Sequence, residues 1–389
     1  MLASPLDTSA SLNRPFTSAL AAAAVIAVGM GFGRFAFTGV YPVMVGEGVL
    51  SVSDGTLAAS ANYLGYLIGA LLAARLQAPS ARHWGLVSVV ATVISLGLLG
   101  GVSSPWAIIL IRGAAGVFSA LSMIAASLWL LQHRAHPEGA PILYAGVGVG
   151  IALSAELLAV GERFALDAYQ LWGVLAVASL ILGGGGALLL DGRPLASRPT
   201  QAATLRLDHL PLAAWRLIGL YGLSGLGYII TATYLPLLVK DALGSVNPVH
   251  LWAVFGLGAA PSCYLWHRAH GRFGTRAALR GNLSLQGIGV LLPAISQTPA
   301  AYIASALVVG ATFMGTVTIA MPAAKRVSAD FRMNIMAVMT AAHGIGQILG
   351  PLIAGALYAR THSFNPSLWT ATLALWLAAA LTVGPVTRE

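Results

Sequence analysis

Three charged residues, Arg34, Arg112 and Glu156, lie inside apolar runs long enough to span a membrane. A charged side chain near the centre of a bilayer costs at least about 2.5 to 3.5 kcal/mol on insertion scales, so each of the three is a candidate functional residue. The guanidinium fork of arginine suits bidentate contact with a carboxylate or a phosphate. Two arginines against one glutamate therefore predict an anion site, with Arg34 as its primary contact.

The depths of these charges suggest that they share one site. At 1.5 Å per helical residue, Arg34 and Glu156 each come roughly 22 Å along outward-running helices, and Arg112 comes roughly 10 Å along an inward-running one. All three then lie about 10 Å below the outer face. We expect Arg112 to pair with Glu156 when the site is empty and Glu156 to take up and release a proton. The alternative is structural: a permanent Arg112–Glu156 pair that fixes two helices, with Arg34 bonded to a backbone carbonyl.

Other polar residues extend this site, and Asn62, Tyr63 and Tyr66 reach a similar depth. Tyr228 occupies the position in the second half of the chain that matches Arg34 in the first. His343 and Gln347 lie one helical turn apart and face one direction, so His343 is a candidate proton-titrating group. The predicted substrate contacts besides Arg34 are Tyr228, Asn62, Tyr63, Tyr66 and Gln347. Each has an alternative interpretation as a packed core residue, and His343 as a histidine satisfied within the core.

Composition indicates the elements that carry these residues. The 389-residue chain is 57% hydrophobic and only 8% charged, with a mean hydropathy of +0.81, far from ordinary globular usage. A spanning helix needs roughly 20 apolar residues, and about twelve such segments occur. They lack period-2 alternation and therefore predict an all-α integral membrane protein rather than a barrel. The segments begin near Phe16, Leu57, Trp84, Trp106, Ala140, Ala168, Leu212, Val249, Ala277, Ala301, Met333 and Leu368.

The net charge of +9 follows the membrane topology rather than nucleic-acid binding. With the N-terminus in the cytoplasm, only Arg163, Lys240 and Arg360 among the loop arginines and lysines fall outside. This distribution fits the positive-inside rule with both termini cytoplasmic. The single cysteine, Cys263, lies within the eighth apolar segment and is interpreted as a small core residue.

The sequence indicates a duplication. Gly31, Gly33 and Pro42 return 194 positions later as Gly225, Gly227 and Pro236, and Gly148, Gly150 and Leu153 return at an offset of 196 as Gly344, Gly346 and Leu349. Chance matches of single glycine pairs are the alternative in so glycine-rich a chain. We predict a cytoplasmic tail over 1–15, a six-helix bundle over 16–190, a cytoplasmic linker over 191–211, a second six-helix bundle over 212–386 and a tail over 387–389.

Twelve helices in two related halves with a basic central linker resemble the major facilitator superfamily of secondary transporters, over essentially the whole chain. Residues 31–38 and 227–236 resemble its YbfB/YjiJ-like branch. The resemblance implies alternating access, in which the two halves rock about a central site near the membrane midplane.

The superfamily's motifs are present unevenly. Residues 112–120 are similar to the helix-four pattern whose arginine is linked with proton coupling. The loop 271–276 resembles the cytoplasmic gating motif but has Gly271 where an aspartate is usual, which puts an aspartate latch in doubt. Residues 346–355 resemble the antiporter motif but lie in the eleventh predicted helix rather than the fifth, so they are no evidence of antiport.

The residues and the resemblance together predict a secondary transporter and not an enzyme. We expect a proton-linked or exchange carrier of a small organic anion in a bacterial inner membrane; the alternative is an efflux antiporter for lipophilic or cationic compounds. The expected partners are a small molecule, protons and the lipid bilayer, with no nucleic acid, no cofactor and no metal, and the protein is expected to act as a monomer. No paired carboxylates, phosphate loop or Cys/His metal spacing occurs that would supply chemistry.

Overall fold

The computed structural model describes residues 7–190, 212–239, 247–327 and 335–383, with side chains from residue 15 onward. The predicted linker 191–211 and the tail 387–389 lie outside the described residues. All regular structure within the described residues is helical, as the sequence predicts. Nine helices or unbroken helical runs in this part of the chain have the length and hydropathy to cross a membrane.

The first half of the chain makes six crossings. The first is a composite of α1, a π-helix η1 and α2, and the fourth combines α5 with the short π-helix η3. The bounds are α1 Asp7–Ile26, η1 Ala27–Phe35, α2 Ala36–Gly46, α3 Val52–Ala73, η2 Ala78–Ser80, α4 Ala81–Leu99, α5 Pro105–Leu128, η3 Trp129–His133, η4 Pro137–Gly139, α6 Ala140–Arg163 and α7 Ala168–Leu189.

The second half makes six more. The helix α9 covers two crossings because the chain reverses at Gly274, whose φ of 79° is a left-handed value that favours glycine. One crossing is shared between α10 and α11, which are interrupted at Met314. The bounds are α8 Ala214–Leu238, α9 Val249–Ile295, α10 Pro299–Phe313, α11 Gly315–Val327, α12 Ile335–Thr361 and α13 Asn365–Ala380.

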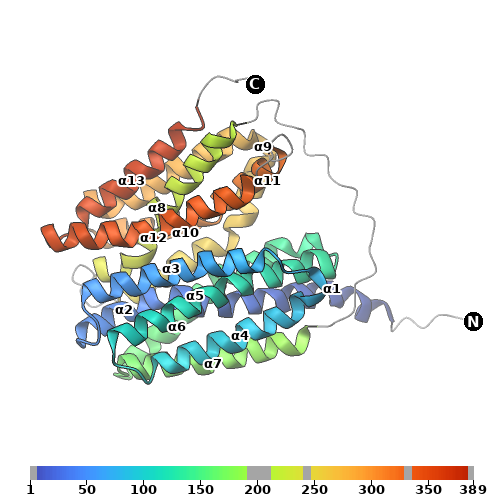
Figure 1. Cartoon of the computed structure of the whole chain (residues 1–389), viewed down its shortest axis with the longest axis horizontal. Coiled ribbons are helices and arrows are strands. Elements are labelled where there is room, and N and C mark those ends of the chain that lie inside the picture. The colour runs from blue at the N-terminus through green and yellow to red at the C-terminus, as the bar shows by residue number, and fades with distance from the viewer. Residues whose placement is uncertain (1–6, 191–211, 240–246, 328–334, 384–389) are drawn as a thin grey trace, which may run out of the picture.

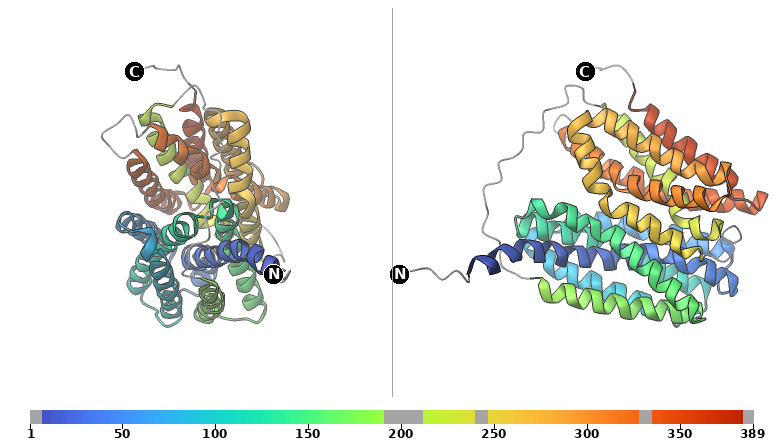
Figure 2. Two further views of the ribbon diagram at one scale, coloured as in Figure 1. Left: turned by 90° about the vertical axis from the view of Figure 1, so that its right-hand side faces the viewer. Right: turned by 180° about the vertical axis from the view of Figure 1, so that it is seen from behind.

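The two halves are separate bundles that lean against each other (Figure 1). They converge at the end opposite the two termini, here named the far side, and splay apart at the end where α1 begins and α13 ends, named the terminal side (Figures 1 and 2). Four helix pairs in the described chain join the halves: α2 with α8, α2 with α9, α3 with α12, and α6 with α9. Thr38 Oγ1 donates to the carbonyl of Ala232 at 2.7 Å, and the 194-residue offset makes these two positions equivalent.

The duplicated glycines mark the same helix crossing in each half. A Cβ on Gly31 would lie 2.4 Å from the backbone of Gly150, so η1 and α6 touch main chain to main chain. In the second half a Cβ on Gly346 would lie 2.3 Å from the carbonyl oxygen of Gly222 on α8. Small residues allow such close approach between membrane helices. The repeat detected in the sequence is therefore a repeat of packing.

The π-helix η1 is the irregular element that carries Arg34. Such insertions leave carbonyls outside the regular i→i+4 ladder and often occur at functional sites. Here side chains satisfy three successive carbonyls: Arg112 donates to the carbonyls of Gly33 and Arg34, and Trp252 Nε1 donates to the carbonyl of Phe35. The backbone around Arg34 is thus held from both halves of the molecule.

Candidate functional site

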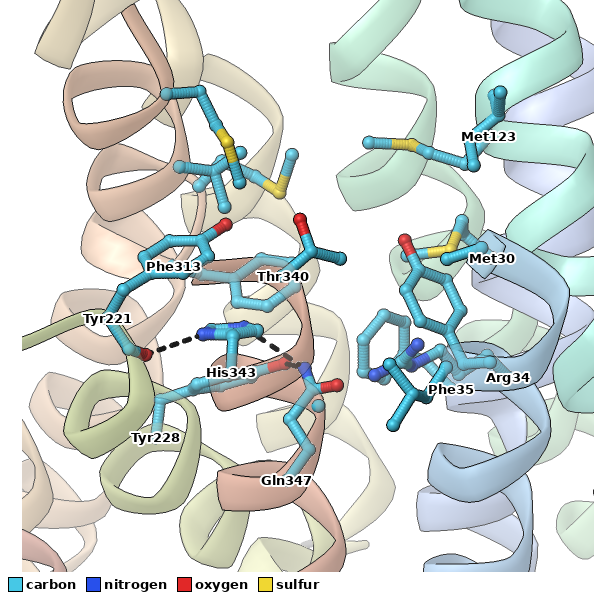
Figure 3. Close-up of a pocket in the computed structure, with 18 residues that line it drawn as sticks. Met30, Arg34, Phe35, Met123, Tyr221, Tyr228, Phe313, Thr340, His343 and Gln347 are labelled. Carbon is cyan, nitrogen blue, oxygen red and sulfur yellow. Dashed lines mark hydrogen bonds between the residues drawn. The ribbon is translucent and has the colours of Figure 1, made fainter. Parts of the chain in front are cut away.

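A cavity of about 230 Å³ lies between the two halves at mid-depth. Figure 3 shows side chains entering it from η1 and α5 of the first half and from α8, α12 and the α10–α11 segment of the second. None of the described residues that line it is acidic. The lining residues are Met30, Arg34, Phe35, Tyr66, Leu67, Ala70, Met123, Ile124, Tyr221, Tyr228, Phe313, Met314, Val317, Met321, Thr340, His343, Gly344 and Gln347.

Arg34 is the one charged side chain among these lining residues, and it is only 3% exposed. Its Nε and Nη1 atoms make no hydrogen bond to any described residue. Its guanidinium carbon lies 4.0 Å from the ring centroid of Tyr66 and 4.9 Å from that of Tyr63. Cation–π contacts of this kind stabilise an arginine without using its hydrogen-bond donors. The donors of Arg34 therefore stay available, and no backbone carbonyl accepts from them in the described chain.

The wall opposite Arg34 is a hydrogen-bonded group on α8 and α12. Nδ1 of His343 lies 2.9 Å from the backbone oxygen of Tyr221, and its Nε2 lies 3.2 Å from Nε2 of Gln347. Gln347 also donates to the hydroxyl of Tyr228. The imidazole stacks on the ring of Tyr221 at a centroid distance of 4.4 Å and on that of Tyr228 at 5.9 Å. The structure thus brings the predicted residues Tyr228, His343 and Gln347 together across the cavity from Arg34 (Figure 3).

The cavity continues toward the terminal side. A second cavity of about 510 Å³ shares Met123, Met314, Val317 and Met321 with the first and reaches the turn η4, Pro137–Gly139. Tyr144 and Cys263 line this outer part, in which Glu138 supplies a carboxylate. The site is therefore reached from the terminal side.

On the far side, hydrogen bonds between the halves seal the cavity. Each joins side chains or backbone of α2 or α3 to α8 or α12. These bonds join Thr38 to Ala232, Thr56 to Tyr234 at 2.7 Å, Tyr63 to Thr233 at 3.0 Å and Ser60 to Ile348 at 3.2 Å. We name this set the far-side seal. A cavity that is open at one end and sealed at the other is one of the two states that alternating access requires.

The expected pairing of Arg112 with Glu156 is wrong in this structure. Arg112 is 2% exposed, and its Nη1 and Nη2 donate to the carbonyls of Gly33 and Arg34 at 2.8 and 2.9 Å. Asn62, expected to contact substrate, instead donates to the carbonyl of Arg112 at 2.8 Å and does not line the cavity. Both side chains lie within the first bundle, where they donate hydrogen bonds to backbone carbonyls.

Glu156 lies apart from the other two charges. Its side chain is 52% exposed, and Oε1 lies 2.9 Å from Nδ1 of His250 at the start of α9. The depth estimate fixes how far along a helix a residue comes, but it does not fix which face of the helix carries it. Glu156 is on the face of α6 that meets α9, outside the cavity, so the three charges do not form one polar site.

Several lining residues were not predicted from the sequence. Tyr221 lies seven residues, two helical turns, before Tyr228, and this spacing on one face was an available signal. Phe35 and Phe313 form an aromatic pair across the halves at a centroid distance of 5.6 Å. No sequence signal marks the break at Met314 that brings Phe313 into the cavity. Tyr63 is close to Arg34 but belongs to the far-side seal rather than to the lining.

Comparisons with known proteins agree with this architecture. The chain superimposes on the crystal structure of a bacterial homolog of the human lysosomal transporter Spinster, inward-facing and unoccupied, with a TM-score of 0.70, 13% identity, and 95% and 96% of the two chains covered. It superimposes on the nucleoside transporter NupG, as a D323A mutant, with a TM-score of 0.66, 17% identity, and 95% and 99% coverage. At these identities the likeness shows the fold alone. No curated protein sequence matches the chain.

A family profile matches residues 26–383, nearly the whole chain, and carries the description "Uncharacterised MFS-type transporter YbfB". This match confirms the resemblance seen in the sequence at the level of both the superfamily and the branch. The chain therefore belongs to the family of YbfB-like transporters of the major facilitator superfamily, which move a small molecule across a membrane by alternating access.

Proposed function

We propose that the protein carries a small organic anion with an apolar or aromatic body, bound at Arg34. The observation that carries this proposal is the buried guanidinium whose Nε and Nη1 have no hydrogen-bond partner among the described residues. A buried, uncompensated charge is costly, so a site of this kind is completed by an anionic ligand. Phe35, Tyr228 and Phe313 supply flat apolar surfaces beside it.

Thermal unfolding of the purified protein with a panel of ligands tests this proposal. Small aromatic carboxylates should raise the melting temperature, whereas lipophilic cations should not. Arg34→Gln should abolish the anion effect, because the ligand loses its charge partner, while Arg34→Lys should retain part of it as a point charge. The matched control is Arg360→Gln, at the exposed end of α12. Equal stabilisation of wild type and Arg34→Gln by anions would overturn the anion role.

We further infer that protons couple through His343 rather than through Glu156. His343 lines the cavity and Glu156 does not. An anion bound at Arg34 offsets the repulsion between Arg34 and an imidazolium, so anion binding and proton uptake would favour each other. In proteoliposomes, His343→Gln should retain anion exchange and lose dependence on the proton gradient, and Glu156→Gln should keep that dependence. The reverse result would return the coupling role to Glu156.

Efflux of lipophilic compounds is the second candidate function. Four methionines, Met30, Met123, Met314 and Met321, line the path, and flexible thioether side chains suit varied apolar ligands. The same thermal panel separates the two functions: stabilisation by lipophilic cations that is indifferent to Arg34→Gln supports efflux and leaves Arg34 a structural role.

For the location, we propose the bacterial inner membrane with the terminal side in the cytoplasm. The support is the basic composition of that side, which includes Arg268, Arg272, Lys325 and Arg326. In this orientation the described state opens inward. Reporter fusions to the C-terminus, active only in the cytoplasm or only in the periplasm, give the orientation directly.

A further inference from the structure

The orientation of the Gln347 amide follows from a chain of hydrogen bonds that begins at a backbone carbonyl. The oxygen of Tyr221 can only accept, so Nδ1 of His343, 2.9 Å away, carries the proton it donates. The hydroxyl of Ser224 donates to the same carbonyl at 2.8 Å and is not available to donate to that nitrogen. In the neutral imidazole, Nε2 is then an acceptor.

Nε2 of His343 therefore accepts a hydrogen bond from Gln347. The amide nitrogen of Gln347 lies 3.2 Å from it and donates its other hydrogen to the hydroxyl of Tyr228. Both amide hydrogens are used within the second half of the molecule. The amide oxygen is consequently turned away from His343, toward the first half, as Figure 3 shows.

This oxygen is a buried acceptor without a partner. Gln347 is 3% exposed, and its Oε1 makes no hydrogen bond in the described chain. It faces the guanidinium of Arg34 across the gap between the halves (Figure 3), and the two groups are not hydrogen-bonded to each other. Buried polar atoms in proteins almost always have partners, and a ligand that accepts from the donors on one wall and donates to the acceptor on the other would satisfy both.

We propose that the substrate is an aromatic or apolar carboxylate that also carries a hydrogen-bond donor, an O–H or N–H group, at the end away from its carboxylate, and that Gln347 Oε1 accepts this donor. The inference rests on the proposed function, since Arg34 must hold the carboxylate. The aromatic side chains of Phe35, Phe313 and Tyr228, which line the cavity, supply apolar surface beside the ring. Gln347 is then the residue that sets specificity among anions.

Three related probes test the proposal: benzoates that carry a hydroxyl, a methoxy group or only hydrogen at ring positions 3 and 4. The hydroxyl donates, the methoxy oxygen can only accept, and the unsubstituted ring does neither. At about pH 8, above the ordinary titration range of histidine, hydroxybenzoate should bind the purified wild type about fivefold more tightly than either analogue, the effect of one net hydrogen bond.

Variants assign that preference to one atom. Gln347→Leu should bring the three affinities within about twofold of one another, because the acceptor is gone while Arg34 remains. Thr370→Val is the matched control: Thr370 lies on α13 outside the cavity, and its hydroxyl donates to the carbonyl of Pro366 on its own helix at 2.8 Å, so the preference should persist.

The outcomes separate this inference from the proposed function. If wild type binds hydroxy- and methoxybenzoate equally and Arg34→Gln loses both, the donor inference is overturned and the anion carrier stands. If wild type binds none of the benzoates, or Arg34→Gln binds them as well as wild type does, both proposals are overturned. The wild-type comparison does not depend on any variant folding.

Discussion

Arg112 and Arg34 are both buried arginines of the first bundle, yet they have opposite roles. Arg112 donates hydrogen bonds to the carbonyls of Gly33 and Arg34, and its guanidinium carbon lies 4.5 Å from the ring centroid of Phe37. Its charge is shared with backbone dipoles. Arg34 keeps its donors for the cavity. One arginine therefore bonds the backbone of the π-helix that carries the other arginine into the cavity.

Arg112→Gln should destabilise the protein by about 3 kcal/mol, because two buried carbonyls of η1 lose charge-assisted hydrogen bonds. The melting temperature of the purified variant measures this loss. Anion affinity should fall as well, since Arg34 loses its fixed position, whereas the pH dependence of binding should not change. A variant with wild-type stability and altered pH dependence would restore the proton-coupling role that the helix-four motif implies.

The hydrogen bond between His343 and Gln347 predicts that the selectivity between ligands depends on pH. When His343 takes up a proton, its Nε2 becomes a donor, so the Gln347 amide must turn over to accept from it and present its NH₂ group to the cavity. Lowering the pH should therefore reduce the preference for hydroxybenzoate over methoxybenzoate. In His343→Gln the preference should be independent of pH. A wild-type preference that stays constant as the pH falls from about 8 to well below the ordinary histidine range would contradict this switch.

At the scale of elements, the sequence predicted the twelve crossings and the repeat, because hydropathy and glycine spacing report directly on membrane span and helix contact. It did not predict the π-helix η1, whose carbonyls accept from Arg112 and Trp252, or the break at Met314, beside which Asn282 bonds to Thr312 and Thr316. The false Arg112–Glu156 pair has a separate cause. Rise per residue gives depth, but it does not fix which face of a helix carries a residue, and Glu156 lies on the face of α6 that meets α9.

The crossing of α6 and α9 is the closest main-chain contact between the halves that glycines provide. A Cβ on Gly148 would lie 2.2 Å from the backbone nitrogen of Ala260, and one on Gly256 would lie 2.5 Å from that of Ala152. Backbone cannot move aside as a flexible side chain can. Helices that must rock against each other at this point therefore need glycine there.

Gly148→Ala should force α6 and α9 apart and destabilise the protein by about 1 to 3 kcal/mol, as overpacking does. Transport should fall more than anion binding, because Gly148 does not line the cavity. Gly281→Ala on α9 is the control: a Cβ there meets nothing within 4 Å, and the better helix former should stabilise slightly. The melting temperature measures the loss of stability, and uptake into proteoliposomes measures the loss of transport. Full transport by Gly148→Ala would show that this crossing does not constrain rocking.

At the scale of the whole molecule, the far-side seal and the open terminal side together define one end state of a transport cycle. The seal consists of a few hydrogen bonds from hydroxyls to backbone carbonyls or to other hydroxyls, each worth about 0.5 to 1.5 kcal/mol. Hydrogen bonds of this strength can form and break within a transport cycle driven by ligand binding. A ligand shifts the equilibrium between two states only by the difference in its affinity for them, and that difference can outweigh bonds of this strength. A dense ionic seal would hold the described state too firmly.

The single cysteine, Cys263, can report on the equilibrium between the described state and the opposite end state of the cycle. Cys263 lines the part of the path that reaches the terminal side, so an impermeant maleimide should label it from that side of the membrane only. Thr38→Val with Thr233→Val removes two bonds of the far-side seal and should move the population toward the opposite state by about tenfold, slowing the labelling.

Thr370→Val is the control for that experiment, because Thr370 on α13 donates only to its own helix, at the carbonyl of Pro366. It should leave the labelling rate unchanged. A hydroxybenzoate that binds between the halves should slow labelling of wild type and not of Arg34→Gln, since the ligand must draw the halves together to reach both Arg34 and Gln347. Equal labelling of Cys263 from both sides, or a rate insensitive to the loss of the seal, would contradict a rocking cycle about this cavity.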